Sequence, residues 1–446
     1  MLNNIKHSNI SKELDILTDF HANGSYEEIA KHFRLLDEKN YAYMVRTTDL
    51  EHENYEYDVK YVTKECYDYL NKSKVYGGEV LINKIGSPGL TYLMPCLNKP
   101  VSLGMNLFML RMKENSGINN ATLYLYLNSK IGKSLITRNI NGTVPLTIDK
   151  ESIRNVLVPV FTQNFQNLLS HVLKMREDFL KNANNLFKQA EDILNRELGI
   201  TNIENTRNYS VKSFSESFCK SKRLDAEYYQ DKYDYFFKQI KSYKNGCNSV
   251  ETYFDYVKTK CARNHSSYLY IEIGDVNIGN GDAYPNLIQT DELPDNAKTM
   301  TKIGDILVST VRPNRGAITV IDSEGILVSG AFTVLRNKNC GYLSETLQVL
   351  FRTEVYRNWF LKFNVGTSYP VIKDKDVLNM KVPIISKDIQ MIISDKVKKS
   401  CKLRKQSKDL LDKAVKAVEL AIEKNEEYAS QWLIENTNEI YHKDKY

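Results

Sequence analysis

The chain has 446 residues, of which 42% are hydrophobic and 26% charged, and its formal net charge is +6. This length is sufficient for two domains with their own cores, and the composition is that of a globular protein rather than a disordered or fibrous one. The weak positive charge permits a nucleic-acid partner but does not require one. No apolar run approaches the roughly 20 residues that span a bilayer, and the first residues lack the apolar core of a signal peptide. We therefore expect a cytoplasmic protein.

Sequence motifs for metal binding and for catalysis are absent. The seven cysteines and seven histidines are scattered, without a Cys-x-x-Cys or His-x-x-x-His pair, which predicts reduced thiols and no metal site. The chain also lacks the Asn/Asp-Pro-Pro-Tyr/Phe loop of DNA amino-methyltransferases and the glycine-rich loops that bind dinucleotides or ATP. We therefore expect a non-catalytic protein with no cofactor of its own.

In chain order, the most informative feature is a repeat: the block 43–160 returns, degraded but in the same order, at 268–384. Two motifs carry the repeat most clearly. They are Gly-Glu-Val-Leu-Ile at 78–82, which returns as Gly-Asp-Ile-Leu-Val at 304–308, and Gly-Thr-Val-Pro at 142–145, which returns as Gly-Thr-Ser-Tyr-Pro at 366–370. The offset is 226 residues from 78 to 304 and 224 from 142 to 366, so the repeat extends over the whole block. Such a duplication predicts two related modules with approximate two-fold symmetry.

Each copy has the pattern of a mixed α/β module. Short apolar stretches bounded by Gly, Pro and Asn predict strands at 43–45, 80–85 and 107–112 in the first copy and at 268–273, 306–311 and 332–335 in the second. Apolar residues at helical spacing predict one helix at 120–135 and its counterpart at 344–363.

A long helix is predicted after each copy. At 161–198, apolar residues recur every seven positions at Phe165, Val172, Phe179, Leu186 and Ile193, and a second stripe follows Leu173, Leu180, Phe187 and Leu194. A helix of these 38 residues would be about 57 Å long. The second helix, at 386–428, has an apolar stripe at Leu410, Leu411, Ala414, Val418 and Ile422. Its basic run at 396–408 fits a solvated face as well as contact with phosphates or an acidic partner.

The two helices can bury their stripes against each other, and a two-fold relation between the copies requires them to run antiparallel. The predicted fold class is therefore α+β, with two pseudo-two-fold related α/β domains separated by two long antiparallel coiled-coil helices. We divide the chain into a first module at 1–160, a central helix at 161–200, a second module at 201–384, and a C-terminal helix and tail at 385–446.

These features resemble the specificity subunit of a type I restriction–modification system, over nearly the whole chain. Arg-Leu-Asp-Ala-Glu-Tyr-Tyr at 223–229 and Thr-Val-Arg-Pro-Asn at 310–314 also resemble segments of its target-recognition domains. The first copy lacks an Arg-x-Asp-Ala-x-Tyr-Tyr segment, so either its opening strand is built differently or this half is abbreviated.

The resemblance implies a partner set and a division of labour. Each target-recognition domain would read one half of a split, asymmetric sequence in double-stranded DNA. The helices would set the gap and dock two methyltransferase subunits, and two translocating nuclease subunits join that core in complete systems. S-adenosylmethionine and ATP would then bind to the partner subunits rather than to this chain.

Loops of the two copies offer the best candidates for contact with DNA, because Arg and Asn can bind guanine and adenine edges bidentately and hydroxyls can bind phosphates. The candidates are Lys84, Ser87, Arg138 and Thr143 in the first copy and Arg312, Asn314, Arg315, Thr367, Ser368 and Tyr369 in the second. The Gly-Thr loops also fit a purely structural turn. Two other functions stay open at this point: a coiled-coil scaffold that binds proteins, and a stand-alone, type IIB-like modification component.

Overall fold

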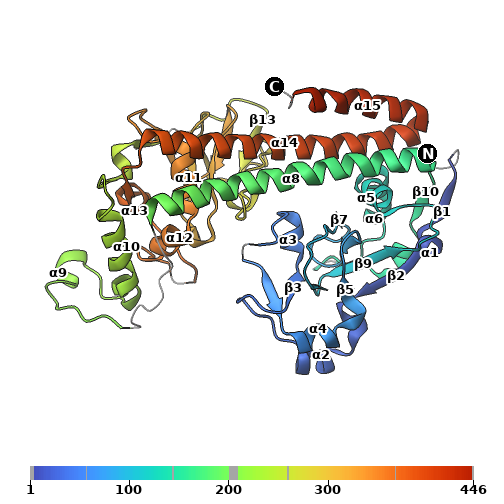
Figure 1. The fold of residues 1–446 in the computed structure, drawn as a ribbon, viewed down its shortest axis with the longest axis horizontal. Helices are drawn as coiled ribbons and strands as arrows, with labels where there is room; N and C mark the ends of the chain where they lie inside the picture. Colours follow the sequence, from blue (N-terminus) through green and yellow to red (C-terminus); the bar gives the residue numbers. More distant parts are fainter. Residues whose placement is uncertain are drawn as a thin grey trace. The chain divides into compact units, whose positions relative to one another are not determined.

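The computed structural model describes residues 5–56, 58–142, 145–199, 209–258, 261–366 and 368–443. The chain divides into two compact units (Figure 1): a first unit of Met1–Lys181 with Leu403–Tyr446, and a second unit of Asn182–Lys402. None of the described helices combines the length and the apolarity that crossing a membrane requires.

The first unit contains three small sheets. β1 (His7–Asn9) pairs with β10 (Leu157–Pro159). A four-stranded sheet has the order β2 (Leu14–Asp19), β9 (Leu107–Met112), β6 (Val80–Asn83) and β7 (Thr91–Leu93). A second one has the order β4 (Lys60–Val62), β3 (Ala42–Val45), β8 (Val101–Leu103) and β5 (Lys74–Val75), in which β3 and β8 run parallel.

The second unit repeats this topology sheet by sheet. β11 (Cys247–Ser249) pairs with β20 (Lys381–Pro383). One four-stranded sheet has the order β12 (Phe254–Tyr256), β19 (Phe332–Asn337), β16 (Ile306–Ser309) and β17 (Ile318–Val320). The other has the order β14 (Asn286–Gln289), β13 (Ser267–Ile271), β18 (Ile326–Ser329) and β15 (Ala297–Met300), with β13 and β18 parallel. The predicted pair of related α/β domains is confirmed.

The helices of the two copies correspond in part, since α5 to α8 are followed in the same order by α11 to α14. In the first unit they are α1 (Ile10–Glu13), α2 (Tyr26–His32), α3 (Thr47–Glu51), α4 (Lys64–Tyr69), α5 (Asn120–Asn128), α6 (Lys130–Thr137), α7 (Lys150–Arg154) and the start of α8 (Gln163–Leu198). From the second half of the chain come α9 (Phe218–Ser221), α10 (Asp231–Lys241), α11 (Ser344–Arg352), α12 (Glu354–Leu361), α13 (Asp374–Asn379), α14 (Lys387–Glu423) and α15 (Glu426–Lys443).

Three predicted helices are each two helices, because a polar residue interrupts each of them. Residues 120–135 break at Ser129, whose extended backbone (φ −69°, ψ 162°) starts α6 and whose hydroxyl accepts a hydrogen bond from the Gly132 N–H. Residues 344–363 break at Thr353, which is extended in the same way (φ −60°, ψ 150°). The C-terminal helix ends at Glu423, and the Asn425 side chain accepts from Tyr428 N–H at the start of α15.

The repeated Gly-acidic motif has a structural explanation. The three residues after the acidic one, 80–82 in the first copy and 306–308 in the second, are fully buried. The middle residue, Leu81 or Leu307, packs into one core cluster, and the residues on either side of it pack into a different core cluster on the opposite face of the strand. The acidic residue forms an ion pair with an arginine on the neighbouring strand, Glu79 with Arg111 (2.9 Å) and Asp305 with Arg336 (2.6 Å). The motif therefore anchors the central strand of each module.

Helices α8 and α14 pack on each other within each unit. In the second unit the Ser400 hydroxyl donates to the Ala183 carbonyl (2.7 Å) and Lys396 Nζ donates to Gln189 Oε1 (2.7 Å). Later residues of α8 therefore contact earlier residues of α14, which confirms the antiparallel arrangement of the two helices. In the first unit the Ser407 hydroxyl donates to the Arg176 carbonyl (3.2 Å).

The buried face of α8 departs from the heptad stripe along the helix. Phe165 and Val172 are buried, whereas Phe179, Leu186 and Ile193 are only half-buried. In the second unit the face is formed instead by residues that are at most 4% exposed, namely Ala183, Phe187, Ala190 and Leu194. A seven-residue stripe drifts by about 20° per heptad on a helix of 3.6 residues per turn. The buried face therefore moves to Phe187 and Leu194 of the second predicted stripe and to two alanines, Ala183 and Ala190, that neither stripe contained. On α14, Leu410, Ala414, Val418 and Ile422 are buried and Leu411 is half-buried.

The opening strands β1 and β11 pair in the same way in the two units, with β10 and β20. In the second unit, helix α10 precedes β11 and buries Tyr233, Phe236 and Ile240. Abbreviation of the first copy stays a prediction.

We predict that Leu433→Ala lowers the free energy of unfolding by about 2–5 kcal/mol, because this α15 side chain is completely buried in the core of the first unit. The neighbouring Ile434 is 44% exposed, and Ile434→Ala should cost only about 0.5 kcal/mol. Urea denaturation followed by circular dichroism measures both changes. Equal losses would contradict the packing of α15 described above.

Candidate nucleic-acid interface

In each unit, the loop after the central strand is paired with the loop before the last short helix. In the second unit the Arg312 N–H donates to the Pro370 carbonyl (2.7 Å), and Ile372 N–H donates to the Thr310 carbonyl (2.9 Å). We call 310–316 and 362–372 the paired loops of the second unit. The first unit has the same arrangement at 84–89 and 138–148, where Gly86 N–H donates to the Leu146 carbonyl (3.1 Å).

The paired loops of the second unit bring Arg312 and Tyr369 together. Arg312 adopts a left-handed backbone conformation (φ 50°, ψ 49°), which is strained for a residue with a side chain, and Pro313 then starts a short 3₁₀ turn. The Arg312 guanidinium lies 5.4 Å from the centre of the Tyr369 ring. Both side chains are exposed, so a cation and an aromatic face are presented to solvent at one place.

The other predicted residues of these loops differ in their exposure. Arg315 and Ser368 are exposed, whereas Asn314 is half-buried and its Oδ1 accepts no hydrogen bond from the described residues. Thr143 and Thr367 lie outside the described residues.

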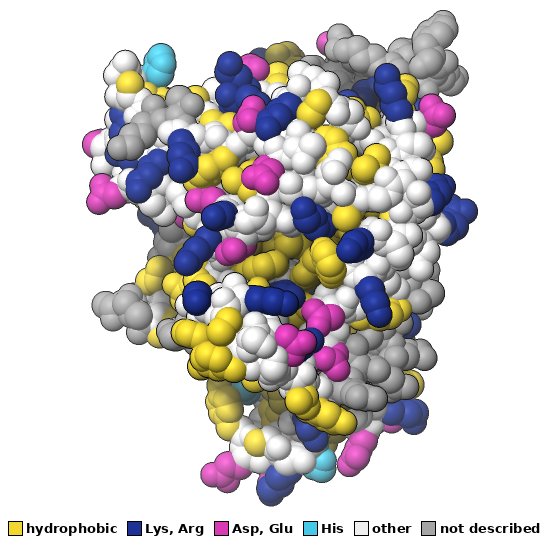
Figure 2. All heavy atoms as spheres, turned by 90° about the vertical axis from the view of Figure 1, so that its left-hand side faces the viewer, with side chains coloured by type: hydrophobic (Ala, Val, Ile, Leu, Met, Phe, Trp, Pro, Cys, Tyr) yellow, Lys and Arg dark blue, Asp and Glu magenta, His cyan; other side chains and the backbone are white. Residues whose placement is uncertain are grey.

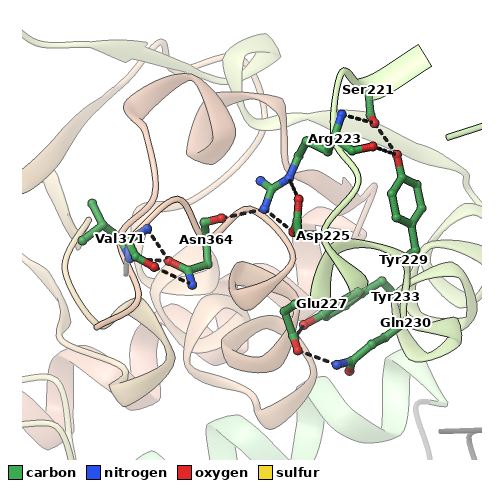
Figure 3. A network of polar contacts seen from close by, with 10 residues as sticks. Ser221, Arg223, Asp225, Glu227, Tyr229, Gln230, Tyr233, Asn364 and Val371 are labelled. Carbon is green, nitrogen blue, oxygen red and sulfur yellow. Dashed lines mark hydrogen bonds and ion pairs between the residues drawn. The ribbon is translucent and has the colours of Figure 1, made fainter. Parts of the chain in front are cut away.

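A polar network stabilises the 362–372 loop (Figure 3). The Asn364 side-chain oxygen accepts from the Gly366 N–H (2.8 Å) and the Val371 N–H (2.9 Å), which closes the loop. The Asn364 carbonyl accepts from Arg223 Nη2 (2.7 Å). Arg223 in turn binds Asp225 with two hydrogen bonds, of 2.6 and 2.7 Å. The 223–229 segment therefore supports the paired loops of the second unit.

Electrostatic shifts follow from these contacts. The hydrogen bonds and the charge of Arg223 hold the pKa of the Asp225 carboxyl below its usual value, although burial alone would raise it. Lys362 is half-buried, with its Nζ 5.0 Å from the centre of the Tyr228 ring and 3.8 Å from an Asp234 oxygen. Burial lowers the pKa of this lysine, and the charge of Asp234 only partly opposes the shift.

In the first unit, Lys84 is not presented to solvent. Its side chain is buried and its Nζ lies 2.9 Å from Asp19 Oδ2, while Lys150 Nζ lies 2.7 Å from Asp19 Oδ1. Burial alone would raise the pKa of Asp19, but the hydrogen bonds and charges of the two lysines outweigh it and lower the pKa. A direct contact of Lys84 with DNA would require this buried ion pair to break. Ser87 and Arg138, in contrast, are exposed.

Both sequence motifs and tertiary contacts define this candidate interface. The residues that only the structure identifies are Asn364, as the support of a loop, and Asp19 with Lys150, as the partners of Lys84. The Arg-x-Asp spacing at 223–225 was visible in the sequence, but its contact with Asn364 was not. The described residues contain no cluster of three or more His, Cys, Asp or Glu side chains that is placed to hold a metal ion.

The face that carries α9 and α10 is of mixed charge (Figure 2). Lys and Arg side chains are scattered over it, with acidic side chains among them, around a hollow lined by hydrophobic side chains. The segment that precedes α10 in the chain also has exposed apolar residues, with Val211 86%, Phe214 63% and Leu224 68% exposed. This face is therefore not uniformly basic.

With the duplicated α/β fold and its paired loops established, comparison with known proteins gives a family resemblance. The specificity subunit of the type I restriction enzyme MjaVIII from Methanocaldococcus jannaschii is 22% identical over 325 residues, which cover 70% of this chain and 71% of that protein. No protein-family model matches the chain. The resemblance to type I specificity subunits that the sequence predicted is confirmed by this match.

Solved structures also overlap the chain at low similarity. The S subunit of a type I restriction–modification system from M. genitalium covers 97% of this chain and 96% of its own, with 13% identity and a TM-score of 0.39. The HsdS subunit from Thermoanaerobacter tengcongensis covers 92% and 96%, with 12% identity and a TM-score of 0.28. The fold assignment therefore rests on the strand orders and helix pairing given above.

We predict that Asn364→Ala loosens the second loop, because two backbone N–H groups lose their acceptor at a local cost of about 1–3 kcal/mol each. Amide hydrogen exchange of Val371 should accelerate. Asn364→Asp is the matched control, since it keeps an acceptor oxygen and should leave that exchange nearly unchanged. Exchange that is identical in all three proteins would show that Asn364 does not close the loop.

The lowered pKa of Asp225 predicts a pH dependence of this support. A carboxyl with a lowered folded-state pKa contributes its full stabilisation above the usual pKa of 3.8 and loses it as the pH falls through the folded value. The contact between Arg223 and Asp225 should therefore be constant at neutral pH and weaken only in acid. In Arg223→Gln, NMR titration of the Asp225 carboxyl should show its pKa rising toward the usual value; an unchanged pKa would contradict the ion pair.

Proposed function

We propose that this chain is the DNA sequence-specificity subunit of a type I restriction–modification complex and is not itself catalytic. The observation that carries the proposal is the complete duplication of a module, with the same strand orders and the same paired loops in both copies. A protein that reads one continuous site needs one such module, whereas a split site needs two. The sequence match to a type I specificity subunit supports the same conclusion.

We propose further that the DNA target is bipartite and asymmetric. The two copies share their scaffold but present different side chains on equivalent loops: Ser87 and Arg138 in one, Arg312, Arg315 and Tyr369 in the other. Different side chains on equivalent loops favour different bases, because direct readout depends on the donors and acceptors presented to the base edges. On this proposal, residues 1–160 and 201–384 form the two target-recognition domains.

The assembly follows from the same proposal. Helices α8 and α14, within 161–200 and 385–446, would set the gap between the half-sites and dock two methyltransferase subunits. Translocating nuclease subunits would complete a restricting complex. S-adenosylmethionine and ATP would bind to these partners, which supply the catalytic chemistry. Some of the lysines and arginines in the first half of α14 form ion pairs with neighbouring side chains, as Lys398 does with Glu345 (3.3 Å).

Co-expression with the methyltransferase encoded beside it, followed by sequencing of the modified bases, tests the function. We expect methylation of one split sequence with a fixed gap. Arg312→Gln should reduce modification of that sequence about 5- to 150-fold, the equivalent of about 1–3 kcal/mol for one bidentate base contact, and should relax one half-site only. Lys241→Gln, at an exposed position of α10, is the control that should change neither half-site.

Three results would contradict the proposal. A complex that methylates no split sequence would remove its basis. Methyl transfer from S-adenosylmethionine by this chain alone would point to a stand-alone modification enzyme. The absence of salt-sensitive DNA binding in the presence of the methyltransferase would point to a protein-binding scaffold. A DNA-binding protein, in contrast, loses affinity for DNA steeply as the salt concentration rises.

A further inference from the structure

We propose that Gln166 and Gln390 are positioning residues that fix each target-recognition domain on its long helix and thereby keep the gap between the half-sites constant. This inference rests on the proposed function and deepens it. It concerns two glutamines that are almost completely buried, 3% and 2% exposed, near the first turns of α8 and α14.

In the first unit, the Gln166 amide joins two separate parts of the chain. Its Nε2 donates to the Gly117 carbonyl (2.8 Å) and to the Phe161 carbonyl (2.9 Å). Its Oε1 accepts from the Asn119 N–H (2.8 Å). Phe161 belongs to the segment that leads into α8, while Gly117 and Asn119 belong to the loop that starts α5. The bonds to Gly117 and Asn119 therefore join helix α8 to the loop before α5, and the bond to Phe161 joins it to its own preceding segment.

In the second unit, the Gln390 amide makes the same three bonds. Its Nε2 donates to the Gly341 carbonyl (3.0 Å) and the Ile385 carbonyl (2.9 Å), and its Oε1 accepts from the Leu343 N–H (2.8 Å). Each of these four residues lies 224 positions after its counterpart, at 166 and 390, 117 and 341, 119 and 343, and 161 and 385. The whole joint has therefore been kept in both copies, including the partners of the glutamine.

A second contact one turn further along each helix supports the joint. In the first unit Asn119 Nδ2 donates to the Ser170 hydroxyl (3.1 Å). In the second unit the Ser394 hydroxyl, again 224 positions later, donates to Glu345 Oε2 (3.0 Å). The partners on the module differ between the copies, whereas the positions on the helix are the same. Helix α8 thus contacts the start of α5, and helix α14 the start of α11, at two successive turns. Two contacts restrict rotation of the module about the long helix as well as its translation along it.

The joint lies at a place where small movements matter for the spacing of half-sites. The helices that begin at it, α5 and α11, continue into α6 and α12, from which the second of the paired loops extends. A pivot of the module at the joint would carry the paired loops along the DNA, where one base-pair step is about 3.4 Å. A polar joint with directional bonds resists such a pivot better than an apolar contact, because a hydrogen bond weakens steeply away from its preferred angle.

The test uses Gln166→Met and Gln390→Met, separately, in the complex with the methyltransferase. Methionine has nearly the same shape but forms none of the three bonds, so exchange of the Asn119 or Leu343 amide should be roughly tenfold faster, with the other unit unchanged. On plasmids carrying the two half-sites at the native gap and at gaps one base pair longer or shorter, modification at the altered gaps should rise roughly tenfold relative to the native gap. The half-site sequences should stay the same.

Exposed neighbours provide matched controls. Asn167→Met and Met391→Ala change the next residue on the same helices, outside the joint, and should leave both amide exchange and gap preference unchanged. Gln166→Asn provides a milder variant in case a Met variant does not fold, since its shorter side chain keeps an amide but cannot reach all three partners.

The outcomes separate this inference from the proposed function. Faster amide exchange with an unchanged gap preference would show that the glutamines only stabilise the fold, and would overturn the inference. Relaxed half-site bases at an unchanged gap would overturn it as well. A wild-type complex that modifies no split sequence would instead overturn the proposed function, and the inference with it.

Discussion

The packing of α8 on α14 is the interaction on which the rest of this structure depends. Each helix is amphipathic over more than thirty residues, 36 for α8 and 37 for α14, and neither could remain exposed along its apolar face in water. Each unit contains part of both helices, so the core of each α/β module is continuous with a segment of the helix pair. The modules are thus built onto the helices rather than linked to them by flexible chain.

The duplication has kept the contacts that hold the scaffold and changed those that face solvent. The carboxylate–arginine pairs Glu79–Arg111 and Asp305–Arg336 join equivalent strands in both units, and the glutamine joints at Gln166 and Gln390 make the same three bonds. A buried polar group without its partner costs free energy, so such sets change together or not at all. Exposed loop residues carry no such penalty, which leaves them free to differ between the copies.

The two copies also differ in how their paired loops are supported. In the second unit Arg223 and Asn364 hold the loop and leave Arg312 exposed beside Tyr369. In the first unit the counterpart of Arg312 is Gly86, whose N–H donates to the Leu146 carbonyl, and the nearby Lys84 is bound internally by Asp19. The two loops therefore have one backbone arrangement but different local charge.

The sequence by itself determined the duplication, the two long helices, the antiparallel pairing and the strand cores, because apolar periodicity and repeated motifs are local signals. Only the tertiary structure decided which side chains are available at the loops. Lys84 is buried because Asp19, 65 residues away, folds against it, and Arg223 supports a loop through Asn364, which lies 141 residues later. It also decided which stripe of α8 is buried at each end, because a helix of 3.6 residues per turn moves a heptad stripe steadily around its axis. Such contacts depend on residues brought together from distant parts of the chain, and no local pattern specifies them.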